Sequence, residues 1–288
     1  MNDAIKIMLK QYGSIKDQED QNNALKEIIQ HIALLGLQRA KFFDKAAFYG
    51  GTALRMLYGL DRFSEDMDFC LENMEPSFSF KPYLETVSSE LSQFGFDAQV
   101  EEKRCGDDVA VNSAFVKQNT LKAMLLIGKK ANRIHNNQLL KVKLEVDKNN
   151  PRGAKFCKKL ISLPTPFMIR TLTEPSLFAG KLHAIIARSY INRVKGRDYY
   201  DLLFYAARKT KVNIQYLEAK LINSKHLSGK TKLTKDKLQT LLIDKFKDVD
   251  FNKAKEDVSP FIKAEQRKYI QDWDCDLFSA LCDDLQIE

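Results

Sequence analysis

Long hydrophobic runs are missing from this chain of 288 residues, in which 29% of the side chains are charged. A transmembrane helix needs roughly 20 consecutive apolar residues, and no segment approaches that length. The first residues, MNDAIKIMLKQYGS, have neither the apolar core nor the small-residue cleavage site of a secretion signal. These absences predict a cytoplasmic protein without a membrane span.

Cysteine and histidine are scarce and scattered. The five cysteines form no CxxC pair, and the four histidines have no metal-ligand spacing. Zinc sites and disulfide frameworks depend on such spacing, so the sequence favours neither and fits a reducing compartment. The 44% hydrophobic content predicts a sizeable core, and the net charge of +8 favours a polyanionic partner such as nucleic acid or a nucleotide.

The chain changes character near residue 165, which predicts an α/β (α+β) domain over residues 1–165 and an all-helical domain over residues 166–288. Before this point, segments with helical spacing alternate with short β-branched runs, and after it nearly every segment has helical spacing. The expected helices are 24–40, 52–59, 80–94, 176–193, 198–209, 213–223, 234–247 and 260–270, and the expected strands are 46–50, 66–72, 96–103, 109–117, 121–128 and 138–148.

Two carboxylates lie close together in the stretch FYGGTALRMLYGLDRFSEDMDFCLE, residues 48–72. Asp66 and Asp68 fall on one face of the expected strand, where two unpaired carboxylates would repel each other. Mg²⁺ relieves such repulsion, because it takes hard oxygen ligands and often uses one or two carboxylates plus substrate phosphates. An exposed strand face paired with lysine or arginine remains the alternative.

A glycine-rich turn precedes this pair. Gly50 and Gly51 lack a Cβ atom, so their backbone can approach a ligand closely. The amides of Thr52 and Ala53 lie in the first turn of the expected helix, which is a site for anions. Thr52 adds a hydroxyl donor, or is simply an N-cap. A nucleoside triphosphate with Mg²⁺ needs both a phosphate cradle and a metal-binding pair, and this segment offers both.

A third carboxylate that could complete a two-metal site lies in the strand KVKLEVD. Alternation places Lys141, Lys143, Glu145 and Asp147 on one face. Glu145 is the preferred third ligand because it lies in mid-strand, whereas Asp147 is nearer the turn. Pairing of these charges with one another is an equally weighted alternative.

A second charged cluster occurs in KLHAIIARSYINRVKGRDYYDLL, residues 181–203. Lys181 and Arg188 share one face of a helix, and Asp198 and Asp201 begin the next helix after Gly196. The alternative is structural: Asp198 as an N-cap, Asp201 near the positive helix end, and the two cations as solvated charges.

These residues resemble the AbiEii-type nucleotidyltransferases, toxins of type IV toxin–antitoxin and abortive-infection systems within the polymerase-β-like superfamily. GGTALRMLYGLDRFSEDMDF is similar to the family's glycine-rich turn, helix and Asp-x-Asp signature. The later motif, a lysine on a helix followed by Arg-Asp-x-x-Asp-Leu, is similar to Lys181, Arg197, Asp198, Asp201 and Leu202.

The resemblance implies a mixed β-sheet flanked by helices, with the helical domain completing an active-site cleft. Lys181 would reach the triphosphate, and Asp198 would orient Lys181 or the nucleotide. The implied catalytic residues are Asp66, Asp68, Glu145, Lys181 and Asp198; the implied metal ligands are Asp66, Asp68 and Glu145; and the implied nucleotide-binding residues are Gly50, Gly51, Thr52, Lys181, Arg197 and Asp201.

The implied activity is Mg²⁺-dependent transfer of a nucleoside monophosphate from an NTP to RNA, with the 3′ end of tRNA as the acceptor. Modified tRNA would then arrest growth, and a cognate antitoxin is an expected partner. Transfer to a protein or small molecule is one alternative. A non-catalytic nucleotide- or nucleic-acid-binding protein of the same fold is another.

Overall fold

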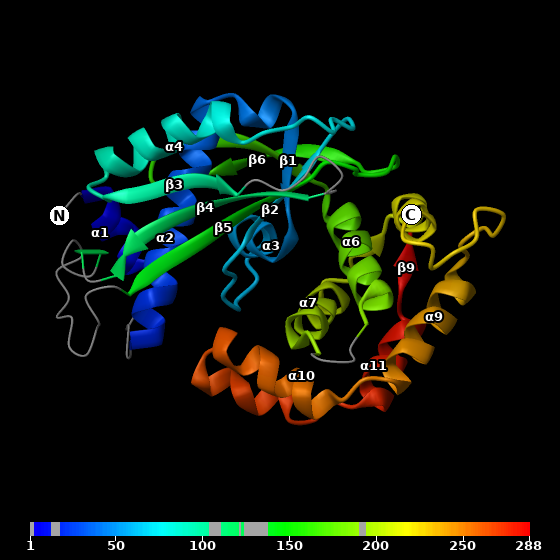
Figure 1. Ribbon diagram of the computed structural model, residues 1–288. Coiled ribbons are helices and arrows are strands. Elements are labelled where there is room, and N and C mark those ends of the chain that lie inside the picture. Colours follow the sequence, from blue (N-terminus) through cyan, green and yellow to red (C-terminus); the bar gives the residue numbers. More distant parts are fainter. Residues whose placement is uncertain (1–2, 13–17, 104–110, 121, 124–137, 190–193) are drawn as a thin grey trace. The chain divides into compact units, whose positions relative to one another are not determined.

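The computed structural model describes residues 3–12, 18–103, 111–120, 122–123, 138–189 and 194–288 (Figure 1). The chain forms two compact units. Unit 1 comprises Met1–Leu57, Ser64–Asn150 and Lys158–Thr171, and unit 2 comprises Tyr58–Phe63, Pro151–Cys157 and Leu172–Glu288. Across the described ranges, no helix combines the length and apolar character that a bilayer crossing requires.

A seven-stranded mixed sheet in the order β3-β4-β5-β2-β1-β7-β6 is the centre of unit 1. The pairs β3–β4, β4–β5 and β1–β2 are antiparallel, whereas β2–β5 and β1–β7 are parallel. The strands are β1 (Ala46–Tyr49), β2 (Met67–Leu71), β3 (Ala98–Lys103), β4 (Val111–Asn119), β5 (Leu139–Asp147), β6 (Phe156–Ile161) and β7 (Phe167–Leu172).

The two faces of β5 show why this segment is a strand. Val142, Leu144 and Val146 are fully buried, and the charged residues between them are at least partly exposed. This period-two pattern suits a sheet with one face on a core. The alternation predicted from the sequence is thus confirmed for β5.

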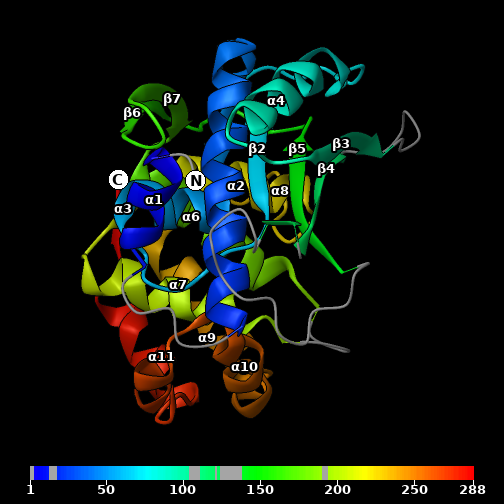
Figure 2. The same ribbon diagram turned by 90° about the vertical axis from the view of Figure 1, so that its left-hand side faces the viewer.

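Helices α2 and α4 pack against each other in unit 1, and α4 also packs against β3. Figure 2 shows the long α2 with α4 beside one of its ends. Phe42 is buried and stacks edge-to-face on Phe69 of β2 at 5.0 Å between ring centroids, which ties the helical layer to the sheet. The helices are α1 (Asp3–Lys10), α2 (Gln18–Arg39), the 3₁₀ turn η1 (Phe42–Asp44), α3 (Gly50–Tyr58) and α4 (Lys81–Gln93).

Unit 2 is helical, with one short parallel pair of strands, β8–β9. Its core is aromatic: Tyr199, Phe246 and Phe278 are fully buried and contact one another. Its elements are α6 (Glu174–Ala187), α7 (Gly196–Ala207), β8 (Lys211–Val212), α8 (Ile214–Asn223), α9 (Lys235–Lys247), α10 (Phe251–Val258), η2 (Ser259–Phe261), η3 (Ala264–Ile270), α11 (Cys275–Asp283) and β9 (Gln286–Ile287).

The predicted α/β class, a mixed sheet with helices followed by a helical region, is confirmed. Strands β6 and β7 were not predicted, nor were α10, α11 and the β8–β9 pair. The helix expected at 260–270 is instead two 3₁₀ segments, η2 and η3. Of the strand expected at 121–128, only residues 122–123 are described, and they are helical; the other residues lie outside the described part, as do 190–193.

Candidate active site

The start of α3 lies directly against the Asp68 side chain in unit 1. Tyr49 at the end of β1 pairs with Asp68 of β2, and Gly50 follows at once as the first residue of α3. Gly50 has a φ of 81°, in the left-handed region that glycine tolerates. A Cβ atom at this position would lie 2.2 Å from Oδ2 of Asp68. The chain therefore needs glycine here for both backbone conformation and space.

Thr52 fixes the backbone of Asp66, the other aspartate of the pair. Its side chain is fully buried, and its hydroxyl donates a hydrogen bond to the carbonyl oxygen of Asp66. Thr52 lies inside α3, so it is not the N-cap that was its alternative role, and its hydroxyl is engaged by Asp66. Together with Gly51 it belongs to the first turn of α3, where backbone N–H groups have no intrahelical acceptor and can bind an anion.

The third predicted carboxylate lies beside Asp68. Parallel pairing of β2 with β5 sets Asp68 opposite Glu145, so both side chains are on one face. The alternative ligand, Asp147, lies opposite Cys70, and its Oδ1 accepts a hydrogen bond from the Asn149 amide at 2.9 Å. The strand register therefore favours Glu145 over Asp147.

Glu145 forms an ion pair with a lysine of its own strand. Oε1 of Glu145 lies 2.6 Å from Nζ of Lys143. The pKa of Lys143 is raised, first by this hydrogen bond and further by the charges of Glu145, Asp66 and Asp68, although burial acts in the opposite direction. The Lys143 ammonium is therefore within electrostatic reach of all three predicted metal ligands.

Asp66 and Asp68 have the donor chemistry for a hard cation, since Mg²⁺ is commonly held by one or two carboxylates plus substrate phosphates. Among the residues that the structure describes, no three Asp, Glu, His or Cys side chains gather closely enough to hold a metal ion. The three-carboxylate set expected from the sequence is not assembled, and Glu145 binds Lys143 instead. The fit to Mg²⁺ thus rests on the two aspartates.

The second predicted cluster forms a buried ionic network in unit 2. Nζ of Lys181 lies 2.8 Å from Oδ1 of Asp198 and 2.7 Å from Oδ2 of Asp201. Arg188, just after the end of α6, contacts the other oxygen of Asp198. The structure thus brings together Lys181, Arg188, Asp198 and Asp201, which the sequence had placed on two successive helices.

Both aspartates of this network are buried but remain charged. Burial raises the pKa of Asp198, and the charges of Lys181 and Arg188 more than offset this, so that the pKa lies below its usual range. Burial also raises the pKa of Asp201, and the charges of Arg62 and Lys181 more than offset this, so the pKa of Asp201 is lowered as well. Asp198 is held by two cations and therefore fixes the position of the Lys181 ammonium.

Arg197, a predicted nucleotide-binding residue, makes different contacts. Its Nε lies 3.9 Å from Oδ2 of Asp257, and its guanidinium lies over the ring of Phe261 at 4.1 Å from the centroid. Gly196, the residue before it, packs so closely on α10 that a Cβ would lie 1.8 Å from the carbonyl oxygen of Ala254. Arg197 therefore joins α7 to the α10–η2 segment.

Residues 32–276 match the protein family described as "Nucleotidyl transferase AbiEii toxin, Type IV TA system". The chain belongs to the AbiEii family. It is accordingly a nucleotidyltransferase toxin of a type IV toxin–antitoxin system, which implies an NTP substrate and an antitoxin partner. The matched range includes both the Gly50–Asp68 segment and the Lys181–Asp201 network.

Two solved structures from Helicobacter pylori are similar to this AbiEii protein. JHP933 shares 20% sequence identity, with 93% of this chain and 90% of that chain covered and a TM-score of 0.49. A protein described as a candidate nucleotidyltransferase shares 20% identity, with 88% and 94% covered and a TM-score of 0.44. No curated protein matches the chain with significant sequence similarity.

Arg62 is a charged residue of this AbiEii protein to which sequence reasoning gave no role. Its side chain is 2% exposed, and its Nε and Nη2 donate to the two oxygens of Asp201 at 2.6 and 2.7 Å. The neighbours of Arg62 in the sequence are Asp61, which is exposed, and Phe63, which is buried. No pattern in this segment predicts that Arg62 is buried or that it pairs with Asp201.

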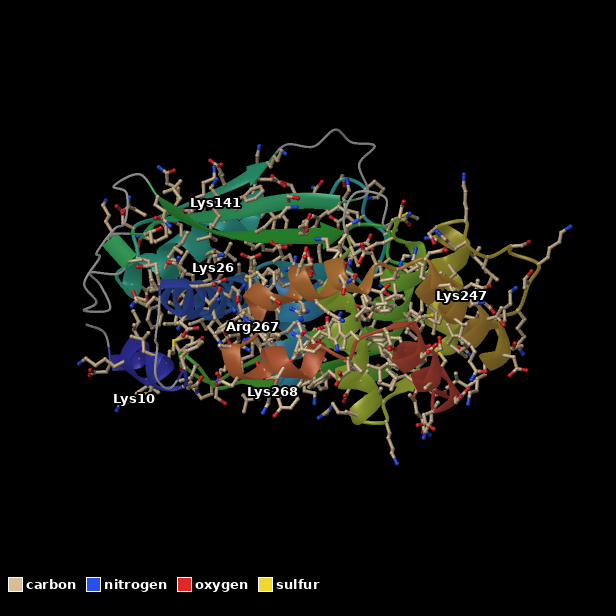
Figure 3. All side chains as sticks on the ribbon, turned by 90° about the horizontal axis from the view of Figure 1, so that it is seen from below. Lys10, Lys26, Lys141, Lys247, Arg267 and Lys268 are labelled. Carbon is tan, nitrogen blue, oxygen red and sulfur yellow. The ribbon has the colours of Figure 1, made fainter. Side chains whose placement is uncertain are left out.

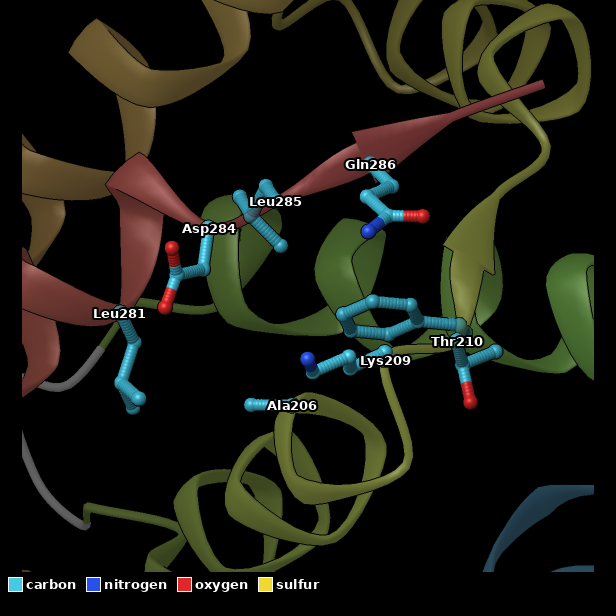
Figure 4. Close-up of a pocket in the computed structure, with 8 residues that line it drawn as sticks. Ala206, Lys209, Thr210, Leu281, Asp284, Leu285 and Gln286 are labelled. Carbon is cyan, nitrogen blue, oxygen red and sulfur yellow. The ribbon is translucent and has the colours of Figure 1, made fainter.

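One cavity of this AbiEii protein lies in unit 2 and has a volume of about 140 Å³. Lys209 and Thr210 line this cavity together with Asp284–Gln286 (Figure 4). None of the predicted site residues lines it. The candidate site is assigned from its side-chain chemistry and from the family.

Proposed function

We propose that this AbiEii protein transfers a nucleoside monophosphate from an NTP to RNA, with the 3′ end of tRNA as acceptor and Mg²⁺ as the metal. The observation that carries the proposal is the contact between the first residue of α3 and Asp68, with space for no Cβ atom at Gly50. This contact supports the proposal, because the first turn of α3 could bind phosphate and the adjacent Asp68 carboxylate could hold the metal of an NTP.

The protein's own residues would divide the work. The first-turn amides of α3 would bind phosphate oxygens, and Asp66 and Asp68 would hold the cation, with the Thr52 hydroxyl fixing the Asp66 backbone. Mg²⁺ would neutralise charge on the triphosphate and activate the attacking hydroxyl. We retain Lys181 as the predicted contact to the triphosphate, with Asp198 as its positioning residue. An NTP and tRNA as substrates would place the reaction in the cytoplasm.

Asp201 fits a different role from the predicted nucleotide contact. Asp201 is fully buried, and its carboxylate forms ion pairs with Arg62 and Lys181. Its oxygens are therefore already engaged by cations. We propose that Asp201 positions Lys181 and stabilises unit 2. Residues 1–165 would then carry the catalytic carboxylates, and residues 166–288 would supply Lys181.

A transfer assay tests the acceptor and the metal. The protein is incubated with Mg²⁺ and bulk tRNA, and each of the four α-labelled NTPs is supplied separately. We expect label on RNA with the wild type and a loss of at least about 100-fold with Asp68→Asn, since misplaced reacting groups cost this much or more. The matched control is Asp97→Asn, because Asp97 is exposed and pairs with Lys122.

Two further variants separate the third-ligand alternatives. Glu145→Gln is expected to lower transfer more than Asp147→Asn, because Glu145 lies opposite Asp68 in the sheet. Label that appears on protein or a small molecule, with none on RNA, would contradict the proposed acceptor. Equal transfer by wild type and Asp68→Asn would contradict the proposed site.

A further inference from the structure

An aromatic pocket in unit 2 has no role in the proposed reaction. Its volume is about 230 Å³, below the range of roughly 300–1,000 Å³ typical of drug-sized ligands, so it suits one planar ring system. We call it the aromatic pocket, and its lining residues are Asp61, Tyr200, Leu203, Phe204, Tyr269, Ile270 and Trp273.

Tyr269 gives this pocket an exposed stacking surface. Its side chain is 69% exposed, whereas Trp273 is 2% exposed. Trp273 is held in place by Tyr200, at 6.3 Å between ring centroids, and by Phe278, at 5.6 Å with the rings at 83°. The pocket thus combines a rigid aromatic wall with an aromatic ring at its rim, and base stacking on such rings is a common mode of single-strand binding.

Two polar groups belong to residues that line the aromatic pocket. Asp61 is exposed, and its carboxylate accepts from the Tyr200 hydroxyl at 2.7 Å and from Gln266. A carboxylate has about four acceptor positions, so it can accept a further hydrogen bond. Nε1 of Trp273 is buried and has no hydrogen-bond partner among the described residues, which is uncommon for a buried donor.

Positive charge lies beside the pocket. Arg267 and Lys268 are exposed and immediately precede Tyr269; Figure 3 labels both on the segment that carries η3. Nζ of Lys268 lies 4.9 Å from the centroid of the Tyr269 ring. A cationic ligand would be repelled by these two residues, whereas the phosphates on either side of a base would be attracted.

We infer that the aromatic pocket binds one unstacked nucleobase of a single-stranded RNA segment. The base stacks on Tyr269, an exocyclic amino group donates to Asp61, and a neighbouring phosphate pairs with Arg267 or Lys268. Adenine, cytosine and guanine fit better than uracil, because each of them offers an exocyclic amino group to the carboxylate and uracil has none. The inference rests on the proposed function only in taking RNA as the acceptor.

The test uses the fluorescence of Trp273, because it is the protein's single tryptophan. The full-length Asp68→Asn variant is titrated with oligoadenylate, oligocytidylate and oligouridylate, without Mg²⁺ or NTP, so binding is measured apart from transfer. We expect a saturable change, tighter for oligoadenylate and oligocytidylate. Stacking contributes about 1–3 kcal/mol per base, so Tyr269→Ala should weaken binding at least about fivefold, and Tyr269→Phe should retain it.

The contribution of charge is tested with a matched pair of lysines. Lys268→Ala should lower the slope of log affinity against log salt by about 0.7, the value for one phosphate contact on a single strand. Lys247→Ala, which removes another exposed lysine, should leave it unchanged. Unaltered affinity in Tyr269→Ala, or the absence of any fluorescence change with RNA, would overturn the inference. Normal binding without label transfer to RNA would refute only the proposed acceptor chemistry.

Discussion

Arg62 and Asp201 form a buried bidentate pair although they lie 139 residues apart in the sequence. Nε of Arg62 lies 2.6 Å from Oδ1 of Asp201, and Nη2 lies 2.7 Å from Oδ2. Asp201 also binds Lys181 at 2.7 Å. Asp201 thus holds two cations, and one of them is the lysine predicted to contact the triphosphate.

Removal of Arg62 should destabilise the protein strongly. In Arg62→Met, Asp201 keeps one cation in place of two within a fully buried site, and loss of one partner of a buried ion pair costs about 3–5 kcal/mol. Urea unfolding would measure the change in the free energy of unfolding. Arg62→Lys should recover part of it, because lysine keeps the charge but not the two-pronged geometry.

A second variant distinguishes an unpaired charge from lost packing. Arg62→Met combined with Asp201→Leu removes both charges and should be more stable than Arg62→Met alone. If the double variant is instead less stable than the single one, the pair contributes through its shape rather than its charge.

The sequence predicts the contact between the glycine turn and the aspartates of the candidate site because its signals are local. Gly50, Asp66 and Asp68 lie on one continuous strand–helix–strand segment, where alternation and helix-start chemistry apply directly. Strand β5 was equally legible from its alternating apolar residues. The Arg62–Asp201 pair was not, because no periodic pattern relates residues on distant segments.

The edge of the sheet also escaped prediction. Strand β6 has the sequence FCKKLI, in which apolar and charged residues do not alternate, and only Lys158 and Leu160 are exposed. Strand β7 alternates buried and less buried residues over its first four positions, but it lies just after residue 165, where the sequence predicts the start of the helical domain. The fold class was therefore predictable, whereas the extent of the sheet required pairing between β1 and β7.

Gly50→Ala should abolish nucleotide transfer. The added Cβ would lie 2.2 Å from Oδ2 of Asp68, and the carboxylate would have to move; a displacement of about 1 Å at a reacting centre can cost 100-fold. The transfer assay with labelled NTP measures this loss, and circular dichroism checks the fold.

Gly59→Ala is the matched control for this change. Gly59 has a φ of 79°, similar to the 81° of Gly50, but a Cβ there meets nothing within 4 Å. The two variants therefore share the backbone strain of a non-glycine residue at positive φ and differ in the clash with Asp68. Equal losses of transfer in both would show that strain, rather than the contact with Asp68, explains the effect.

His31 on α2 should make stability fall as the pH decreases. Burial lowers its pKa from 6.5 to about 4, so the unfolded chain binds a proton before the folded protein does. Neutral His31 contributes its full stabilisation above pH 6.5. This stabilisation is lost as the pH falls from 6.5 to about 4, at up to about 1.4 kcal/mol per pH unit. Urea unfolding between pH 4 and 7 should show a shallower dependence of the free energy of unfolding on pH in His31→Gln than in the wild type.

Lys143→Met should increase the affinity for a divalent cation. The Lys143 ammonium binds Glu145 at 2.6 Å and interacts with the charges of Asp66 and Asp68, so it competes with a metal for the same carboxylates. Its removal leaves these charges to the cation, and we expect Mn²⁺ to bind at least about tenfold more tightly, or about 1.4 kcal/mol, in calorimetry without nucleotide. Lys141→Met removes a charge two residues earlier on the same face of β5 and should change the affinity much less. If both variants bind Mn²⁺ as the wild type does, Lys143 is only a surface partner of Glu145 and does not oppose the metal.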